Sequence, residues 1–411
     1  MMPASASARA TAAGVAVSTV LPRSVYQVNM QSQFGGGEAY TRSFTLALAE
    51  LGYRAVLFVD RNARFWESIL PAGVDLVRVR EPGDILRRLP QARCMMVTQT
   101  ALDAALAQRV AARHLLCGFV HMPLYEREPA GLRHYHRLLA VSRHVLDSVR
   151  QRGLDNVYGE PLYGVADPRR GASRGPLVAQ SEFDWDRRKF RDRVLGLAEP
   201  WWRMRQSPRE FHRRPGLTLG IVSRLTPIKQ FPLLFGLLVP VIARYPEINL
   251  EIFGNGGYAS VRDLRASLAP IAGQVRFWGH QPDVASVYHQ LDYVLSGLPE
   301  KEALGLNIIE AQHCGTPALA VRAPPFTETM IESETGFFFT DPRQDGGSSF
   351  AQLLQRLLAG APRPDPRQAR AHLERFSAAA FRERVARALG AVAHGLEPLA
   401  ALSGGRPDGL R

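Results

Sequence analysis

Residues 302–320 read EALGLNIIEAQHCGTPALA, and this stretch decides the fold of the chain around it. Two carboxylates, Glu302 and Glu310, stand eight positions apart, and Gly305 lies three residues after the first. An apolar helical pattern follows Gly305, a Gly-Thr-Pro stop ends it, and a short apolar segment comes next. The stretch therefore predicts a loop, a helix, a stop and a buried strand, in that order.

The predicted helix start suits a particular kind of ligand. A loop that leads into a helix presents free backbone N–H groups and a favourable dipole to an anion such as a diphosphate, which makes Gly305 and Leu306 candidate binding residues. The flanking carboxylates of Glu302 and Glu310 can accept hydrogen bonds from hydroxyl groups. An anion joined to a polyol describes a nucleotide sugar. The alternative is an ordinary solvated helix start with a glutamate as its capping carboxylate.

The same residues resemble the signature of retaining GT-B glycosyltransferases of the family-4 type, which has two glutamates with seven residues between them and a glycine third after the first. Glu302 gives this spacing and Glu300 does not, while Leu304 fills the usual bulky position. The resemblance implies an α/β chain with two Rossmann-like, doubly wound domains that face a central cleft. It also implies retention at the anomeric carbon and no required metal, with Glu302 at the donor sugar and Glu310 at the ribose.

A second motif, GIVSRLTPIKQ at residues 220–230, places Arg224 at the end of a predicted strand and Lys229 in the following loop. Two cations at this point are suited to neutralise a diphosphate as its bond to a sugar breaks. The segment resembles the family's strand-Gly-Arg-Leu-x-x-x-Lys-Gly motif, although Ser223 and Gln230 replace its two glycines. The alternative is a pair of ordinary loop cations.

Glycine-rich turns follow two other predicted strands. Residues 33–38, QFGGGE, resemble the family's Gly-Gly-x-Glu loop, with the glutamate one position early, and indicate Gly36 and Gly37 as residues on the phosphate side. Gly254 lies in IFGNGG and resembles a Gly-x-Gly turn near the nucleotide. A tight turn without a ligand is the alternative in both places.

His121 ends the predicted strand 115–120, at an edge where ligands of parallel sheets bind. Members of the resembled family often have a histidine near this point that contacts the transferred sugar. A purely structural histidine is the alternative.

Strand and helix signals alternate in two series, which predicts two parallel sheets covered by helices. The expected strands are 25–30, 54–59, 95–98, 115–120 and 138–142, then 217–222, 249–253, 275–278, 293–296 and 318–321. The expected helices include 41–51, 232–244, 350–358 and 368–394. The expected organisation is a flexible tail (1–23), an acceptor domain (24–168), a basic insertion (169–215), a donor-nucleotide domain (216–376), a helix that returns to the first domain (377–397) and a second flexible tail (398–411).

Bulk composition fits a folded protein, because 46% of the 411 residues are hydrophobic and 22% are charged. No run approaches the length of a membrane span. Three cysteines with no metal or redox spacing indicate a reducing cytoplasm. The formal net charge of +13 favours a polyanionic partner. The basic, Trp-bearing insertion is either a solvated segment or a patch that faces a membrane or acceptor.

The sequence therefore predicts a retaining, metal-independent glycosyltransferase that uses a UDP- or GDP-sugar and no cofactor. Its expected acceptor is a glycan or a lipid-linked glycan in bacterial-type polysaccharide or lipopolysaccharide assembly. We expect a cytoplasmic protein with peripheral contact to the anionic inner face of the plasma membrane and no nucleic-acid partner. The alternative is a non-catalytic nucleotide- or nucleic-acid-binding protein of the same fold. A glycoside hydrolase is disfavoured, because Glu302 and Glu310 on one short segment are poorly placed to act across a sugar.

Overall fold

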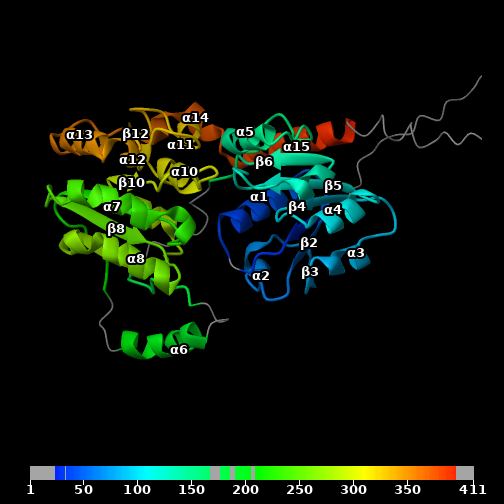
Figure 1. Cartoon of the computed structure of the whole chain (residues 1–411), viewed down its shortest axis with the longest axis horizontal. Helices are drawn as coiled ribbons and strands as arrows, with labels where there is room; N and C mark the ends of the chain where they lie inside the picture. Colours follow the sequence, from blue (N-terminus) through cyan, green and yellow to red (C-terminus); the bar gives the residue numbers. More distant parts are fainter. Residues whose placement is uncertain (1–23, 33, 167–175, 186–189, 205–208, 395–411) are drawn as a thin grey trace, which may run out of the picture.

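The computed structural model describes residues 24–32, 34–166, 176–185, 190–204 and 209–394, which form two α/β domains and a helical insertion (Figure 1). The strands of the first sheet are β1 (Ser24–Asn29), β2 (Arg54–Asp60), β3 (Asp75–Val79), β4 (Met95–Thr98), β5 (Leu115–Val120) and β6 (Arg137–Ala140). The helices of this domain are α1 (Gly36–Glu50), α2 (Trp66–Ile69), α3 (Gly83–Arg88), α4 (Ala104–Ala111), η1 (Ala130–His134) and α5 (Arg143–Gln151).

The second domain repeats the plan. Its strands are β7 (Leu217–Val222), β8 (Ile248–Phe253), β9 (Val275–Gly279), β10 (Tyr293–Leu295), β11 (Ala318–Val321) and β12 (Gly336–Phe339). Its helices are η2 (Pro227–Lys229), α7 (Phe231–Ile242), α8 (Tyr258–Leu268), η3 (Ala269–Gln274), α9 (Val284–Tyr288), α10 (Leu306–His313), α11 (Phe326–Thr329), α12 (Pro342–Asp345), α13 (Ser348–Leu358), η4 (Pro366–Gln368) and α14 (Arg370–Glu374).

Both sheets have the doubly wound strand order. The first runs β3-β2-β1-β4-β5-β6, the second runs β12-β11-β10-β7-β8-β9, and neighbouring strands pair in parallel. The chain reverses its direction of travel across the sheet beside β1 in one domain and beside β7 in the other. Ligands of such sheets bind at this switch point, beyond the carboxyl ends of the strands. The predicted fold class is confirmed.

Burial explains why the strands could be predicted. Every residue of β4 and β5 is buried, as expected for parallel strands covered by helices on both faces, so they appear as continuous apolar runs. The strands β3 and β12 are not among the predicted strands. In β3 four of the five residues are only partly buried, and Asp75 and Arg78 interrupt the apolar run. Helix α1 begins at Gly36 and not near Thr41, so the glycines of the first turn belong to the helix.

The C-terminal helix α15 (Ala378–His394) packs against the first domain, beside α1 (Figure 1). Phe381 is buried in the core of that domain, and its ring centroid lies 5.3 Å from that of Tyr40. Val385 and Leu389 continue the same buried face one and two turns later. The last helix among the described residues therefore ties the second domain back to the first.

Polar contacts also join the two domains. The carboxylate of Glu328 on α11 accepts hydrogen bonds from the backbone N–H groups of Arg143 and His144, at 2.8 and 2.7 Å. The hydroxyl of Ser142 donates to the carbonyl oxygen of Ala303 at 2.6 Å. Glu328 thus satisfies free N–H groups in the first turn of α5, where a negative charge is favoured.

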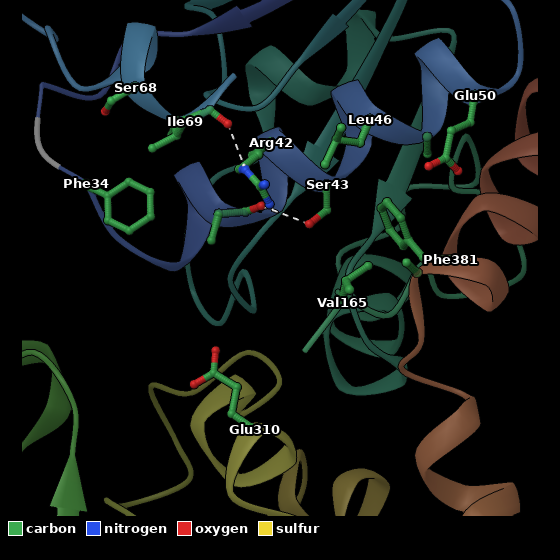
Figure 2. Close-up of a pocket in the computed structure, with 13 residues that line it drawn as sticks. Phe34, Arg42, Ser43, Leu46, Glu50, Ser68, Ile69, Val165, Glu310 and Phe381 are labelled. Carbon is green, nitrogen blue, oxygen red and sulfur yellow. Dashed lines mark hydrogen bonds between the residues drawn. The ribbon is translucent and has the colours of Figure 1, made fainter. Parts of the chain in front are cut away.

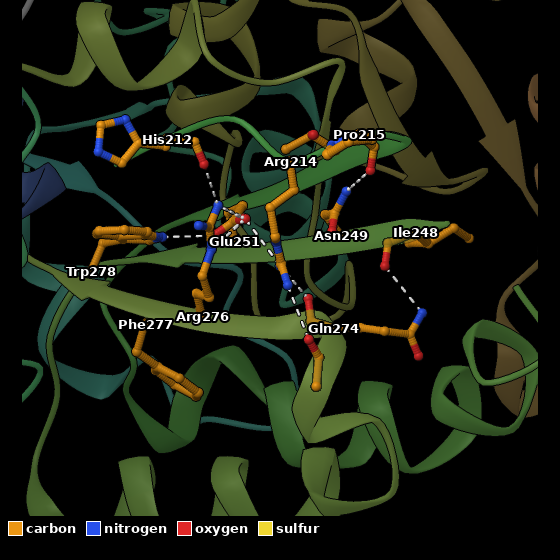
Figure 3. A network of polar contacts seen from close by, with 12 residues as sticks. His212, Arg214, Pro215, Ile248, Asn249, Glu251, Gln274, Arg276, Phe277 and Trp278 are labelled. Carbon is orange, nitrogen blue, oxygen red and sulfur yellow. Dashed lines mark hydrogen bonds and ion pairs between the residues drawn. The ribbon is translucent and has the colours of Figure 1, made fainter. Parts of the chain in front are cut away.

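One buried carboxylate connects β8, β9 and the segment before β7 in the second sheet (Figure 3). Glu251 on β8 is fully buried and accepts hydrogen bonds from Arg276 Nε at 2.9 Å and from Trp278 Nε1 at 2.7 Å. Arg214, which precedes β7, reaches the same carboxylate at 3.1 Å. A buried charge is tolerated only when it is paired and hydrogen-bonded, so this network fixes β8 and β9 to the chain that enters the domain.

Three predicted segments are described only in part or not at all. The tails 1–23 and 398–411 lie outside the described residues, as does part of the insertion 169–215. The described part of the insertion includes α6 (Phe190–Met204), which lies below α8 at the lower edge of the molecule in Figure 1. Among the described helices none is long and apolar enough to cross a membrane.

Candidate active site

A cavity of about 430 Å³ opens between the carboxyl edges of the two sheets. Its walls come from the loops after β1, β7, β8 and β9, from α9 and α10, and from the insertion. The lining residues are Phe34, Gly35, Gly36, Asp184, Val222, Ser223, Arg224, Phe253, Gly254, Asn255, His280, Gln281, Val284, Val287, Tyr288 and Glu310. Four predicted site residues therefore meet here: Gly36, Arg224, Gly254 and Glu310.

Arg224 reaches across the cavity to the glycine turn of the first domain. A Cβ atom built at Gly35 would lie 2.6 Å from Nη1 of Arg224, so a larger residue there would displace the guanidinium from this position. Glu38 lies beside them. Burial raises the pKa of Glu38, while the amide of Asn29 and the charge of Arg224 act in the opposite direction. Gly35, which is not among the predicted site residues, is thus the glycine of this turn that lies closest to the predicted phosphate-side cation.

Gly254 lines the cavity, yet its own backbone accounts for its identity. Its φ of 142° is a conformation that other residues rarely adopt, and a Cβ there would lie 1.8 Å from the carbonyl oxygen of Ser223. A Cβ atom built at Gly256 would likewise lie too close to the backbone, 2.0 Å from the carbonyl oxygen of Leu225. These glycines let the turn after β8 pack against the loop that carries Arg224.

Lys229 and Glu302 form an ion pair at the start of α10, with Nζ 2.5 Å from Oε2. The other oxygen of Glu302 accepts hydrogen bonds from the backbone N–H groups of Ala303 and Gly305, at 3.2 and 3.3 Å. Burial by itself would raise the pKa of Glu302, but the charge of Lys229 and these hydrogen bonds hold it below its ordinary value. Neither side chain lines the cavity described above.

The pairing of these two residues follows from the topology. Lys229 lies in the loop after β7 and Glu302 in the loop after β10, and β7 and β10 are neighbours on the two sides of the switch point. Their loops therefore leave the sheet side by side. Gln230, next to Lys229, has a left-handed backbone with φ 54° and ψ 26°, which explains why the resembled motif has a glycine there.

Glu310 projects from α10 into the space between the domains (Figure 2). The hydroxyl of Tyr288 donates a hydrogen bond of 2.9 Å to its Oε2. Burial raises the pKa of Glu310 to about 7, an effect that the hydrogen bond from Tyr288 partly offsets. A carboxylate that titrates near neutral pH in a cavity is typical of a functional site.

The insertion contributes one wall of the cavity through Asp184. The backbone N–H of Asp184 donates to the carbonyl oxygen of Gly256 at 2.8 Å, and Phe183 pairs with Gly256 as an isolated parallel bridge. The segment therefore runs beside the turn after β8. No pattern in the sequence separated Asp184 from its charged neighbours, because the contact depends on how the insertion folds back.

The remaining predicted residues lie outside the lining of the cavity. His121 Nε2 lies 2.8 Å from Oε1 of Gln99, and burial lowers the pKa of the imidazole to about 4, so the ring is neutral at physiological pH. A Cβ at Gly37 would meet nothing within 4 Å. Gly305 caps α10 with a φ of 81°, and the side chain of Leu306 points toward Gly36 and Gly164.

A second cavity of about 380 Å³ adjoins the first and shares Phe34 and Glu310 with it (Figure 2). It lies mainly against the first domain and the end of the chain. Its other lining residues are Ala39, Arg42, Ser43, Leu46, Ala47, Glu50, Ser68, Ile69, Val165, Ala378 and Phe381. Glu310 therefore stands between a cavity bounded largely by the second domain and a cavity bounded largely by the first.

The chain is similar to known proteins in sequence and in fold. Residues 205–372 match the family model described as glycosyl transferases group 1. D-inositol 3-phosphate glycosyltransferase of Rhodococcus opacus (strain B4) is 32% identical over 169 residues, which is 38% of this chain and 36% of the relative. The matched segments span about a third of the length of the first curated relatives.

Solved structures match over nearly the whole chain. HepE of Anabaena in complex with UDP has a TM-score of 0.64 at 16% identity, covering 90% of this chain and 100% of that one. The lipopolysaccharide outer core galactosyltransferase WaaB has a TM-score of 0.60 at 14% identity, covering 90% and 99%. Residues 205–372 are therefore similar to group 1 glycosyl transferases, and the chain as a whole has the GT-B fold.

Proposed function

We propose that this protein is a retaining glycosyltransferase that moves a sugar from a nucleotide sugar to a glycan or lipid-linked acceptor. The observation that carries the proposal is the cavity shared by the two domains, in which Arg224 and Glu310 face the glycine turn of the first domain. Parallel sheets bind nucleotides at this edge. The matched family supports the same class of donor.

In this proposal the donor lies across the second domain. The ribose hydroxyls donate to the carboxylate of Glu310, and the base lies toward His280 and Gln281, which also line the cavity. The diphosphate lies between Arg224 and the start of α10. The guanidinium offers a planar set of donors to phosphate oxygens, and the free N–H groups of the helix start add to it.

The Lys229–Glu302 pair would act at the bond that breaks. Lys229 is held by Glu302 on one side and is free to share its remaining protons with a phosphate oxygen, which stabilises the charge that develops on the leaving diphosphate. Glu302 then positions both the lysine and a hydroxyl of the donor sugar. The acceptor hydroxyl then bonds to the anomeric carbon from the side of the leaving group. As the resembled family implies, the bond from that carbon to the diphosphate breaks, and the departing phosphate oxygen takes the hydroxyl proton. Its independence of a metal stays a prediction.

The second cavity is the proposed acceptor entrance. It adjoins the first at Glu310 and combines polar groups, such as Ser43, with apolar walls from Phe34, Leu46 and Ile69. Such a mixed surface suits a sugar with an apolar neighbour. The similarity in fold to an enzyme named for the lipopolysaccharide outer core supports an acceptor in cell-surface glycan assembly.

His121 has a supporting part in this proposal. Its imidazole is neutral and lies against the rings of Tyr40 and Phe119, at centroid distances of 5.0 and 5.8 Å. A neutral ring can accept or donate one hydrogen bond to a sugar hydroxyl but does not serve as a general acid.

A donor panel tests the proposal. UDP-, GDP- and ADP-sugars are added to the purified chain, and the melting temperature is followed, because a ligand stabilises the state that it binds. We expect one base to raise the melting temperature in the wild type and to lose this effect in Glu310→Ala. NMR of the product with the preferred donor should show the donor's anomeric configuration. Inversion would contradict the retaining mechanism, and the lack of any shift with all three bases would contradict the donor class.

A further inference from the structure

Helix α6 has an apolar face and an acidic face, and its apolar face is the one exposed to solvent. Phe190, Leu197 and Trp201 are 73%, 72% and 74% exposed, and Val194 is exposed as well. Spacings of four, three and four residues put all four side chains on one face of a helix. Single exposed apolar residues are ordinary, but a continuous row of this kind marks an interaction surface.

The opposite face of α6 holds its acidic residues. Asp192 and Glu199 are buried against the protein, and Glu199 accepts a hydrogen bond of 2.5 Å from Nε1 of Trp185. A Cβ at Gly196 would lie 3.0 Å from the same indole, so the helix packs closely on Trp185. The inner face thus takes up both acids of the helix.

Arginines flank the exposed row. Arg191 and Arg193 are exposed, and each guanidinium lies near an aromatic ring: Arg191 is 4.5 Å from the ring of Tyr258, and Arg193 is 5.6 Å from that of Phe190. The solvent-facing side of α6 therefore carries Phe, Val, Leu, Trp and Arg and no acid among its described residues. The chain as a whole has a formal net charge of +13.

We propose that the exposed face of α6 docks onto an anionic membrane surface. Helices that lie in the membrane interface have large apolar side chains on one face and arginines at its borders, whose charges remain with the headgroups. The indole of Trp201 is suited to the boundary between headgroups and acyl chains. Burial of both acids leaves the outward face complementary in charge to anionic lipid.

The docking surface is joined to the donor cavity. Trp185 stacks near Phe183, with centroids 4.8 Å apart, and Phe183 lies 5.8 Å from Tyr258 at the start of α8. Asp184, between the two aromatic residues, lines the cavity itself. Contacts through Trp185 and Phe183 therefore connect the exposed face of α6 to the wall of the cavity that Asp184 forms. The assignment does not rest on the proposed glycosyl transfer.

Vesicle flotation with the whole 411-residue chain tests the surface. The vesicles are phosphatidylcholine alone, or equal parts of phosphatidylcholine and phosphatidylglycerol, at low and at physiological salt. We expect the wild type to float with the anionic vesicles, less at higher salt, and not with the neutral ones. Leu197→Glu with Trp201→Glu should lower the partition coefficient by more than about tenfold. Arg191→Gln with Arg193→Gln should lower it by about fivefold for each arginine.

Matched controls lie outside α6. Leu233→Glu replaces an exposed leucine on α7, and Arg262→Gln replaces an exposed arginine on α8; both should float like the wild type. Circular dichroism and sedimentation velocity accompany each variant.

The proposal is overturned if the wild type fails to float at low salt, or if the α6 variants float unchanged. It is also overturned if the wild type self-associates through α6 without binding lipid, which would assign the face to a second copy of the chain. Nucleotide release without vesicles should be unchanged in the α6 variants, so failure of the membrane surface and failure of the transferase are separate results.

Discussion

Lys229 and Glu302 are 73 residues apart in the sequence and form an ion pair of 2.5 Å at the start of α10. The pair connects the loop after β7 with the loop after β10, at the switch point of the second sheet. It sets one cation at the helix start where the diphosphate is proposed to bind.

Replacement of Lys229 by alanine should lower donor turnover by about a hundredfold or more, because it removes a charge aimed at the leaving group. It also removes the charge that holds the pKa of Glu302 down. Initial rates of nucleotide release at saturating donor give the effect. Arg262→Ala, at an exposed pair on α8, is the matched control and should keep wild-type turnover. An equal loss in both variants would show that the effect is not specific to the site.

Gly35→Ala should reduce activity and leave stability almost unchanged. The new methyl group would meet Nη1 of Arg224, the mobile end of a side chain, so the guanidinium moves and the backbone does not. We expect weaker nucleotide binding by calorimetry and a wild-type melting temperature. Gly236→Ala, on α7 with open space around it, is the control. If Gly35→Ala binds nucleotide as tightly as the wild type, Arg224 is not a phosphate ligand.

Nucleotide affinity should depend on pH through Glu310, whose pKa burial raises to about 7. The proposed ribose contact needs the carboxylate, so affinity should rise as the pH increases through this value. Stability should change in the opposite direction. The folded protein retains a proton that the unfolded chain loses in the ordinary carboxyl range, so the stabilising contribution is complete below that range and is lost as the pH rises through about 7.

Two variants separate these effects in calorimetry and thermal unfolding over a pH series. Glu310→Gln cannot titrate and should flatten both profiles. Tyr288→Phe removes the hydrogen bond that partly offsets burial, so the midpoint should move to higher pH. A wild-type profile that matches that of Glu310→Gln would show that this carboxyl does not titrate near neutrality.

The buried carboxylate of Glu251 should matter for stability and not for chemistry. Glu251→Ala leaves Arg214 and Arg276 without their partner inside the domain, which should cost about 3 kcal/mol of unfolding free energy. Urea denaturation measures the change. Asp263→Ala, in an exposed pair, should stay within about 0.5 kcal/mol of the wild type. A cost for Glu251→Ala as small as that of the control would show that the network contributes little.

The contact of Glu328 with α5 should hold the two domains in their observed relation. Glu328→Ala removes the acceptor of two backbone N–H groups. Hydrogen exchange at the amides of Arg143 and His144 should then become faster, with little change inside the sheets. Glu332→Ala, which breaks an exposed pair with Arg322, should leave these amides unaffected. Unchanged protection in Glu328→Ala would mean that water replaces the carboxylate without loss.

The elements that could be predicted are those whose own residues mark them, as continuous apolar runs or as glycine and proline at the ends of a helix. The strands at 95–98, 115–120, 217–222 and 318–321 were predicted with their observed bounds, because they are continuous buried runs. Helix α10 was predicted because a glycine before it and a Gly-Thr-Pro stop after it mark both ends. The motif around Arg224 and Lys229 indicated cations at a strand end, where the structure has them.

The features that could not be predicted depend on contacts between segments that are far apart in the sequence. No local signal distinguishes Gly35 from Gly36 and Gly37, because the close approach that sets Gly35 apart comes from Arg224 in the other domain. Asp184 lies in a charged run whose fold-back onto Gly256 leaves no periodic signal. The direction in which α6 points its apolar residues also depends on what lies beneath it. In each case a contact between segments far apart in the chain decides the role.

The most direct test of the central claim is nucleotide release from the preferred donor sugar, measured for the wild type, Lys229→Ala and Glu310→Ala at equal folded concentration. We expect release by the wild type, a loss of about a hundredfold or more in Lys229→Ala, and a sharp loss in Glu310→Ala, with circular dichroism unchanged. Wild-type release rates in both variants would contradict the assignment of this cleft as the site of sugar transfer.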